Sequence, residues 1–199
     1  MDANPATPLT EEQALQLFRD AGAFLEGHFL LTSGLHSPHY VEKFRVLERP
    51  HMTSLLCGRI ADEYRAAGVT VVLGPATGGI ILAHETARQL GVRVMFTERV
   101  EGAMVLRRGF SLSPADRVLL VEDVITTGGS VRELIELVRE TGAGIVALAF
   151  LVDRSGGRAR FDVPSRPLIT LDVVTYEPDQ CPLCRQGVPL VKPGRTGKI

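Results

Sequence analysis

Residues 118–131 have the sequence VLLVEDVITTGGSV, and they are the most informative segment of the chain for its fold. The four apolar residues from Val118 to Val121 predict a short buried strand. Two acids, Glu122 and Asp123, follow that strand, and a turn of hydroxyl residues and glycines then leads into a helical pattern. A strand, a polar turn and a helix in this order are typical of the βα units that build parallel sheets.

Similar units lie on both sides of this stretch. Short apolar runs alternate with helical patterns, and a capping box from Thr10 to Gln13 predicts an earlier helix. The other runs are residues 69–73, 92–96, 145–152 and 168–174, and the other helices are expected at about 50–67, at 80–90 and from the glycine turn to about residue 140. We therefore predict an α/β fold with a five-stranded, mainly parallel sheet flanked by helices. A hairpin is expected around residues 104–110.

The 199 residues are expected to form a single domain with three parts. Residues 10–48 mix aromatic residues with Ser, Gly and Pro after the first helix, and we expect them to form a small hood subdomain. The core is expected at about 50–175, and residues 176–199 form a C-terminal tail.

Composition excludes several classes of protein. The net charge is −1, so the chain lacks the basic surplus of a nucleic-acid-binding protein. No apolar run approaches the ~20 residues of a membrane span, and the first residues lack the pattern of a secretory signal. Three cysteines are too few for a disulfide framework. We expect a cytoplasmic protein that binds neither nucleic acid nor membranes.

Residues 122–130 have the composition of an anion site. Glycines let the backbone approach a ligand closely, and the N–H groups at a helix start favour phosphate. Carboxylates beside such a site make sense if they accept hydrogen bonds from sugar hydroxyls or face Mg²⁺. The alternative is a capped helix without a ligand. The stretch lacks both the Gly-Lys-Ser/Thr of a Walker A loop and the Gly-x-Gly-x-x-Gly of dinucleotide-binding proteins.

As a whole, residues 118–131 resemble the donor-binding segment of type I phosphoribosyltransferases. The resemblance implies that Glu122 and Asp123 hold the ribose 2′- and 3′-hydroxyls of the donor, 5-phosphoribosyl 1-pyrophosphate. It also implies that the following loop wraps the 5-phosphate through Thr126, Thr127, Gly128, Gly129 and Ser130.

Three further segments resemble the orotate phosphoribosyltransferases within that family, and the likeness runs from about residue 24 to 174. Residues 29–40 (FLLTSGLHSPHY) are similar to the base-binding segment, and residues 74–80 (GPATGGI) to the pyrophosphate loop. Val152-Asp153-Arg154 resembles the segment whose arginine meets the orotate carboxylate; alternatively, Arg154 is a surface arginine. The implied donor contacts are Ala76, Thr77 and Gly78, and the implied orotate contacts are Thr32, Ser33, Gly34, Tyr40, Thr127 and Arg154.

Two segments depart from the family pattern. Thr32 stands where many members carry lysine. The mobile loop of many members is rich in Lys and His, whereas residues 98–110 (ERVEGAMVLRRGF) contain neither, and they resemble a subgroup with a Leu-Arg-Arg-Gly-Phe segment. The loop instead supplies Arg99, Arg107 and Arg108, and which of these replaces the catalytic lysine stays open.

The resemblance implies a Mg²⁺-dependent glycosyltransferase (a pentosyltransferase) of pyrimidine and UMP biosynthesis, which converts orotate to orotidine 5′-monophosphate. The metal is expected to be held mainly by donor and water, so no protein ligand is named. A homodimer that shares the mobile loop across subunits is implied as well. Two alternatives remain: a phosphoribosyltransferase for another base, and a regulatory protein of the same fold that senses the donor.

Cys181-Pro182-Leu183-Cys184 has the spacing of half a zinc site, but a structural zinc has four ligands. Cys57 lies on a predicted helix, and no histidine follows His84. Two thiols do not complete a site in one chain, although a dimer could supply four. The alternative is a solvent-facing turn. His36 and His39 are expected to be turn or surface residues without a chemical role.

Overall fold

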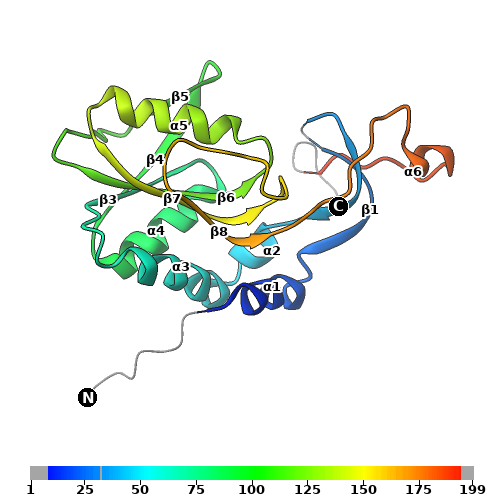
Figure 1. Cartoon of the computed structure of the whole chain (residues 1–199), viewed down its shortest axis with the longest axis horizontal. Coiled ribbons are helices and arrows are strands. Elements are labelled where there is room, and N and C mark those ends of the chain that lie inside the picture. Colours follow the sequence, from blue (N-terminus) through cyan, green and yellow to red (C-terminus); the bar gives the residue numbers. More distant parts are fainter. Residues whose placement is uncertain (1–8, 32, 194–199) are drawn as a thin grey trace.

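The computed structural model describes residues 9–31 and 33–193. They form a six-stranded sheet with helices on both faces, and a separate two-stranded hairpin at one side (Figure 1). The elements in chain order are α1 (Glu11–Asp20), β1 (Phe24–Leu30), β2 (His36–Val41), α2 (Phe44–Leu47), α3 (Pro50–Tyr64), β3 (Val71–Pro75), α4 (Gly78–Leu90), β4 (Arg93–Val100), β5 (Ala103–Leu106), β6 (Arg117–Ile125), α5 (Gly129–Glu140), β7 (Gly144–Asp153), β8 (Ser165–Thr170) and α6 (Pro182–Arg185).

The large sheet has the order β5-β4-β3-β6-β7-β8. All neighbours pair in parallel except β4 and β5, which are antiparallel. The five apolar runs of the sequence are the five parallel strands, so the mainly parallel α/β fold is confirmed. The structure adds β5 as an antiparallel sixth strand at the edge.

The hairpin predicted around residues 104–110 was placed wrongly. It is formed by β4 and β5, and Val100 pairs with Ala103 next to the turn. The two turn residues, Glu101 and Gly102, have φ angles of 51° and 89°. Positive φ at both positions suits the two-residue turns that join antiparallel strands. The polar composition of this segment did not reveal the pairing, because β5 is short and mostly unburied.

The strands bury alternate side chains in two cores, one on each face of the sheet. Val72 and Leu119 belong to the core covered by α3 and α4, whereas Val71 and Leu120 belong to the core covered by α5. This alternation follows from the period of two along a strand. Figure 1 shows α5 on one side of the sheet and α3 and α4 on the other. The predicted capping box from Thr10 to Gln13 is present at the start of α1.

The strand order reverses between β3 and β6. From β3 the chain first continues to β4 on one side, and β6 then pairs on the other side. In sheets of this kind, ligands bind beyond the carboxyl ends of the strands at the point where the order reverses. The loops after β3 and β6 therefore meet where a ligand site is expected.

The β1–β2 hairpin lies beside the C-terminal tail (Figure 1). His36 and Tyr176 exchange two backbone hydrogen bonds of 2.9 and 2.8 Å, and Phe29 forms a parallel bridge with Val191. Among residues 9–31 and 33–193, no helix is long and apolar enough to cross a membrane.

Candidate active site

Two carboxylates stand at the carboxyl end of β6. Glu122 and Asp123 are 8% and 4% exposed, and Asp123 Oδ2 lies 2.6 Å from the Nζ of Lys43. Gly78, at the start of α4, approaches this acid so closely that a β-carbon there would lie 1.8 Å from Asp123 Oδ2. Glycine is required at 78 because the loop after β3 and the end of β6 touch at this point.

Burial and the neighbouring charge of Asp123 raise the pKa of Glu122 from 4.5 to about 8. Burial is the larger cause, because an ionised carboxylate loses its hydration there. The pair therefore carries less negative charge at neutral pH than its sequence indicates. Hydroxyl donors or a further cation near Glu122 would favour its ionised form.

The loop from Thr126 to Ser130 forms the start of α5. Gly128 has φ 77°, and a β-carbon there would lie 2.7 Å from the ring of Phe161. No side chain of the N-cap position forms a hydrogen bond with the first turn of α5, because that position is Gly128. The N–H groups of this turn and the positive end of the helix favour a phosphate.

A cavity of about 480 Å³ lies between the hairpin, this loop and the end of β7. Its volume is within the range of small-molecule sites. Four cationic side chains line it, and no carboxylate does so among the described residues. The lining residues are Leu30, Leu31, Ser33, Leu35, Tyr40, Val41, Lys43, Val124, Thr126, Thr127, Arg132, Arg154, Ser155, Arg158, Ala159, Val173, Thr175 and Pro193. Such a cavity is suited to a ligand with several negative charges.

Arg154 is the most unusual cation of this cavity. It follows β7 and lies over the ring of Tyr40, with 5.7 Å between its Cζ and the ring centroid. Its Nε is buried without a hydrogen-bond partner, and no described carboxylate forms an ion pair with it. Burial lowers the pKa of Arg154. A partly buried guanidinium without an anion is suited to an anionic ligand group. Arg154 is half-buried and lines the cavity, so it is not a fully exposed surface arginine.

A second cavity of about 60 Å³ lies beside the acids, and Ala76, Arg99, Glu122 and Ser130 are among its lining residues. The structure thus brings Ala76 of the predicted pyrophosphate loop and Ser130 of the predicted donor loop to the same cavity. Thr77 is exposed in the turn between β3 and α4.

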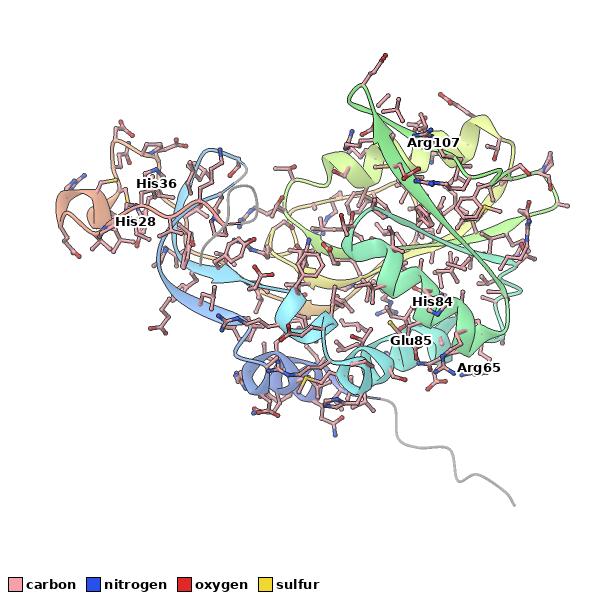
Figure 2. The ribbon with its side chains drawn as sticks, turned by 180° about the vertical axis from the view of Figure 1, so that it is seen from behind. His28, His36, Arg65, His84, Glu85 and Arg107 are labelled. Carbon is pink, nitrogen blue, oxygen red and sulfur yellow. The ribbon has the colours of Figure 1, made fainter. Side chains whose placement is uncertain are left out.

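The three loop arginines have different surroundings. Arg99 is paired with Glu133 of α5 at 2.7 Å, and Arg108 with Glu98 at 2.8 Å. Arg107 is exposed and forms no ion pair within the described residues. Figure 2 shows it beside the β4–β5 hairpin, on the opposite side of the molecule from His28 and His36.

The predicted base contacts separate into three groups. Ser33, Tyr40, Thr127 and Arg154 line the large cavity. Gly34 is exposed next to Ser33 and is absent from the lining. The prediction for Thr32 falls outside the described residues.

Sequence reasoning missed three cations of the cavity, which are Lys43, Arg132 and Arg158. Lys43 follows β2, and the available signal was its position, because it is one of only three lysines in the chain and stands just after the base-binding segment. Arg132 lies on the first turn of α5 and donates a hydrogen bond of 2.7 Å to the carbonyl of Thr127. Arg132 lies in α5 one residue beyond the motif of residues 118–131, so the resemblance did not include it.

The chain is similar to known phosphoribosyltransferases in both sequence and structure. Residues 49–166 match the model of the phosphoribosyl transferase domain. The orotate phosphoribosyltransferase of Caldicellulosiruptor bescii is 48% identical over 96% of this chain and 100% of its own length. The orotate phosphoribosyltransferase of Desulforamulus reducens is 52% identical over 94% of this chain and 97% of its own length.

Solved structures agree with the sequence relatives. The crystal structure of orotate phosphoribosyltransferase from Aeropyrum pernix is 28% identical, with a TM-score of 0.67 over 78% of this chain and 92% of that one. Adenine phosphoribosyl transferase from Trypanosoma brucei is 20% identical, with a TM-score of 0.62 over 84% of this chain and 82% of its own, and this likeness concerns the fold alone. The chain therefore belongs to the phosphoribosyltransferase family, among its orotate phosphoribosyltransferases.

Proposed function

We propose that the protein catalyses the reaction for which its relatives are named: transfer of the 5-phosphoribosyl group from 5-phosphoribosyl 1-pyrophosphate to orotate. The products are orotidine 5′-monophosphate and pyrophosphate. The observation that carries this proposal is the cationic cavity, which has an uncapped helix start at one side and the unpartnered Arg154 at the other. The two substrates together carry a phosphate, which suits the start of α5, and a carboxylate, which suits Arg154.

The donor is proposed to lie along the loops after β3 and β6. The 5-phosphate accepts hydrogen bonds from the N–H groups and hydroxyls of residues 126–130, and the ribose hydroxyls donate to Glu122 and Asp123. The pyrophosphate lies over residues 76–78. Lys43, which is paired with Asp123 in the absence of ligand, is within reach of this negative charge.

Orotate is proposed to lie in the large cavity, with its carboxylate on Arg154 and its ring beside Tyr40. A guanidinium binds a carboxylate through two parallel hydrogen bonds. A neutral base would leave these donors buried and unsatisfied, which costs roughly 1–3 kcal/mol for each group. The proposed specificity for an anionic pyrimidine follows from this difference.

The chemistry needs no protein nucleophile. A ring nitrogen of orotate attacks the ribose C1′ and forms the glycosidic bond, while the C1′–oxygen bond to pyrophosphate breaks and its electron pair leaves with that group. The proton of the attacking nitrogen passes to an oxygen of the departing pyrophosphate. The residues of the chain contribute position and charge stabilisation. The carboxylates at 122 and 123 offset positive charge that develops on the ribose ring, and the cations offset charge on the leaving pyrophosphate.

Magnesium is part of this proposal. Two adjacent carboxylates beside a phosphate site supply the oxygen atoms that Mg²⁺ prefers, and it normally keeps several waters. When bound with the donor, Mg²⁺ neutralises charge on the pyrophosphate. The pKa of Glu122 fits such a partner, since a cation nearby favours its ionised form.

We further propose a homodimer in which the segment after β5 reaches the site of the neighbouring subunit. The β4–β5 hairpin projects beyond the body of the sheet, and Arg107 follows it (Figure 1). This arginine has no carboxylate partner within the described residues and is free to meet pyrophosphate. Light scattering that finds an active monomer at assay concentration would overturn the dimer. The three free cysteines suit a reducing compartment, and the cytoplasm is our expected location.

The test is a panel of bases with purified protein, donor and Mg²⁺, in which pyrophosphate release is measured. We expect turnover with orotate and rates lower by about 10⁴-fold with uracil, adenine or guanine. Asp123→Asn should abolish donor binding in calorimetry without unfolding the protein. Faster use of a purine would favour another base, and donor binding without turnover of any base would favour a donor-sensing protein.

A further inference from the structure

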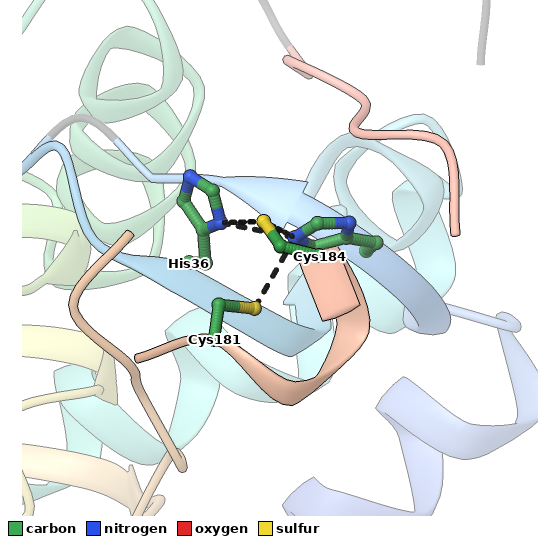
Figure 3. A group of neighbouring side chains, drawn as sticks. His36, Cys181 and Cys184 are labelled. Carbon is green, nitrogen blue, oxygen red and sulfur yellow. Dashed lines mark hydrogen bonds between the residues drawn. The ribbon is translucent and has the colours of Figure 1, made fainter. Parts of the chain in front are cut away.

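A compact cluster of histidines and cysteines lies at the contact between the β1–β2 hairpin and the tail, and none of its members lines the proposed active-site cavity (Figures 2 and 3). We call it the His–Cys cluster, and its members are His28, His36, Cys181 and Cys184. Each member offers one nitrogen or sulfur atom, and these four atoms all lie within 4.8 Å of one another.

The spacing of these atoms is that of ligands around one zinc ion. His28 Nε2 lies 3.0 Å from His36 Nδ1 and 3.4 Å from Cys181 Sγ. Cys184 Sγ lies 3.7 Å from His28 Nε2 and 3.3 Å from His36 Nδ1. Zinc–nitrogen and zinc–sulfur bonds of about 2.05 and 2.3 Å in a tetrahedron place two nitrogens about 3.3 Å apart and a nitrogen and a sulfur about 3.6 Å apart.

Hydrogen bonding alone does not account for this convergence. His28 Nδ1 lies 2.8 Å from the carbonyl oxygen of Val188, which only accepts, so Nδ1 carries the ring proton. Nε2 then has a single lone pair, yet it faces three neighbouring atoms of the cluster. One lone pair satisfies one donor, whereas a metal ion satisfies all four groups together. A zinc-binding histidine typically donates its other N–H to a carbonyl or carboxylate in this way.

Burial points to the same conclusion. Within residues 171–193, Cys181 is the only buried residue, with 0% exposure. The tail thus has no apolar core of its own, although it follows a defined path across the hairpin. His28 and His36 are 2% and 5% exposed beneath it. In small segments of this kind, a metal site commonly supplies the cohesion that apolar burial does not.

We propose that the His–Cys cluster binds one Zn²⁺ ion in each chain and fastens the tail to the β1–β2 hairpin. Two imidazoles and two thiolates in a tetrahedral arrangement favour zinc over harder divalent cations. Four protein ligands leave no open coordination position, so the site is structural and not catalytic. The alternative of a solvent-facing turn at Cys181–Cys184 does not hold for Cys181, which is buried. His36 is buried as well, so its prediction as a turn or surface residue was wrong.

The site also has a consequence for the large cavity. Ser33 and Tyr40 reach the cavity from the hairpin, whereas Val173, Thr175 and Pro193 reach it from the segment 171–193, which contains the described part of the tail. These two segments are joined by a few backbone hydrogen bonds and by the His–Cys cluster. Zinc at the cluster would therefore hold one wall of the cavity in place without contacting a substrate.

The first measurement is the metal content of the full-length protein, purified without an immobilised-metal column and analysed by mass spectrometry. We expect about one zinc per chain. Replacement of zinc by Co²⁺ should produce the absorption bands of tetrahedral cobalt with thiolate ligands. Chelation should lower the unfolding temperature, and limited proteolysis should then cut within residues 171–193 first.

Variants with matched controls locate the site. Cys184→Ser and His36→Gln should reduce the zinc content from about one to below about 0.1 per chain at nanomolar free zinc. His39→Gln, an exposed histidine on the same hairpin, and Cys57→Ala, a thiol buried in α3, should retain it. Zinc content is measured independently of catalysis, so this result does not depend on the proposed reaction.

Several outcomes would overturn the proposal. One is wild-type protein without zinc that takes up neither Zn²⁺ nor Co²⁺ after reduction. Another is a disulfide between Cys181 and Cys184 in freshly purified protein, seen as a mass two hydrogens lower. A third is zinc that persists unchanged in both ligand variants. Because the first two use the wild-type chain, misfolding of a variant does not affect them.

Discussion

Arg154→Met separates the contribution of this residue to binding from its contribution to stability. The substitution removes the guanidinium, which lies over the ring of Tyr40, and keeps an unbranched side chain. In the absence of ligand, the guanidinium has a buried Nε without a partner, and its burial lowers its pKa. Its charge therefore contributes no ion pair to the fold, and we expect the variant to be as stable as the wild type or more so.

The effect on binding is expected to be large and confined to the base. A hydrogen bond to a charged group contributes about 1.5–3 kcal/mol. This corresponds to a rise of roughly 10- to 150-fold in the KM for orotate. The donor binds through the loops after β3 and β6, so its KM should change by less than about threefold.

The assay is initial-rate kinetics with each substrate varied in turn, together with thermal unfolding of the ligand-free protein. Arg166→Met is the matched control, since Arg166 is an arginine of β8 whose Nε lies 3.4 Å from Glu63 and outside the cavity. It should leave both KM values unchanged. An unchanged KM for orotate in Arg154→Met would refute the carboxylate assignment. A lower unfolding temperature with equal rises in both KM values would make Arg154 a structural residue.

The other predictions concern the donor side. Unfolded chains release the proton of Glu122 near pH 4.5, whereas the folded protein keeps it until about pH 8. The unfolded state thus binds fewer protons between these pH values, and the free energy of unfolding should fall as pH rises through this window. Denaturant titrations should find that the free energy of unfolding of Glu122→Gln depends less on pH than that of the wild type. Gly78→Ala would place a β-carbon 1.8 Å from Asp123 Oδ2, so kcat/KM for the donor should fall at least about 100-fold. Gly144→Ala, whose β-carbon has no contact shorter than 3.7 Å, is the control, and equal activity of the two variants would contradict the close-approach argument. Arg107→Ala should slow single-turnover formation of pyrophosphate more than alanine at either of the other two loop arginines, which are held in ion pairs; equal rates in all three variants would remove the loop from the mechanism.

Local sequence patterns predicted the elements that depend on neighbouring residues. The five parallel strands follow from short apolar runs between helical patterns, and the capping box at Thr10 needs only residues three positions apart. The donor loop was recognisable as well, because residues 118–131 contain a strand, its acids and the start of a helix in continuous order. In these cases the interacting groups are close in the chain.

Pairings between distant segments were not predictable in the same way. Sequence reasoning placed the β4–β5 hairpin too late, because its turn depends on positive φ angles at Glu101 and Gly102 and not on polarity. It also missed Lys43, whose partner Asp123 is eighty residues later in the chain.

The α/β class, the donor loop and the family resemblance were therefore predictable from the amino-acid order, since each depends on periodicity or on a contiguous motif. The folded chain was needed to find which cations line the cavity and to find that the Cys181–Cys184 pair has histidine neighbours. Cys181 and His28 are separated by 153 positions, and nothing in their local sequences indicates the contact. Such a site forms only when the tail pairs with the hairpin, because a tetrahedron of ligands is defined by distances in space and not by spacing along the chain.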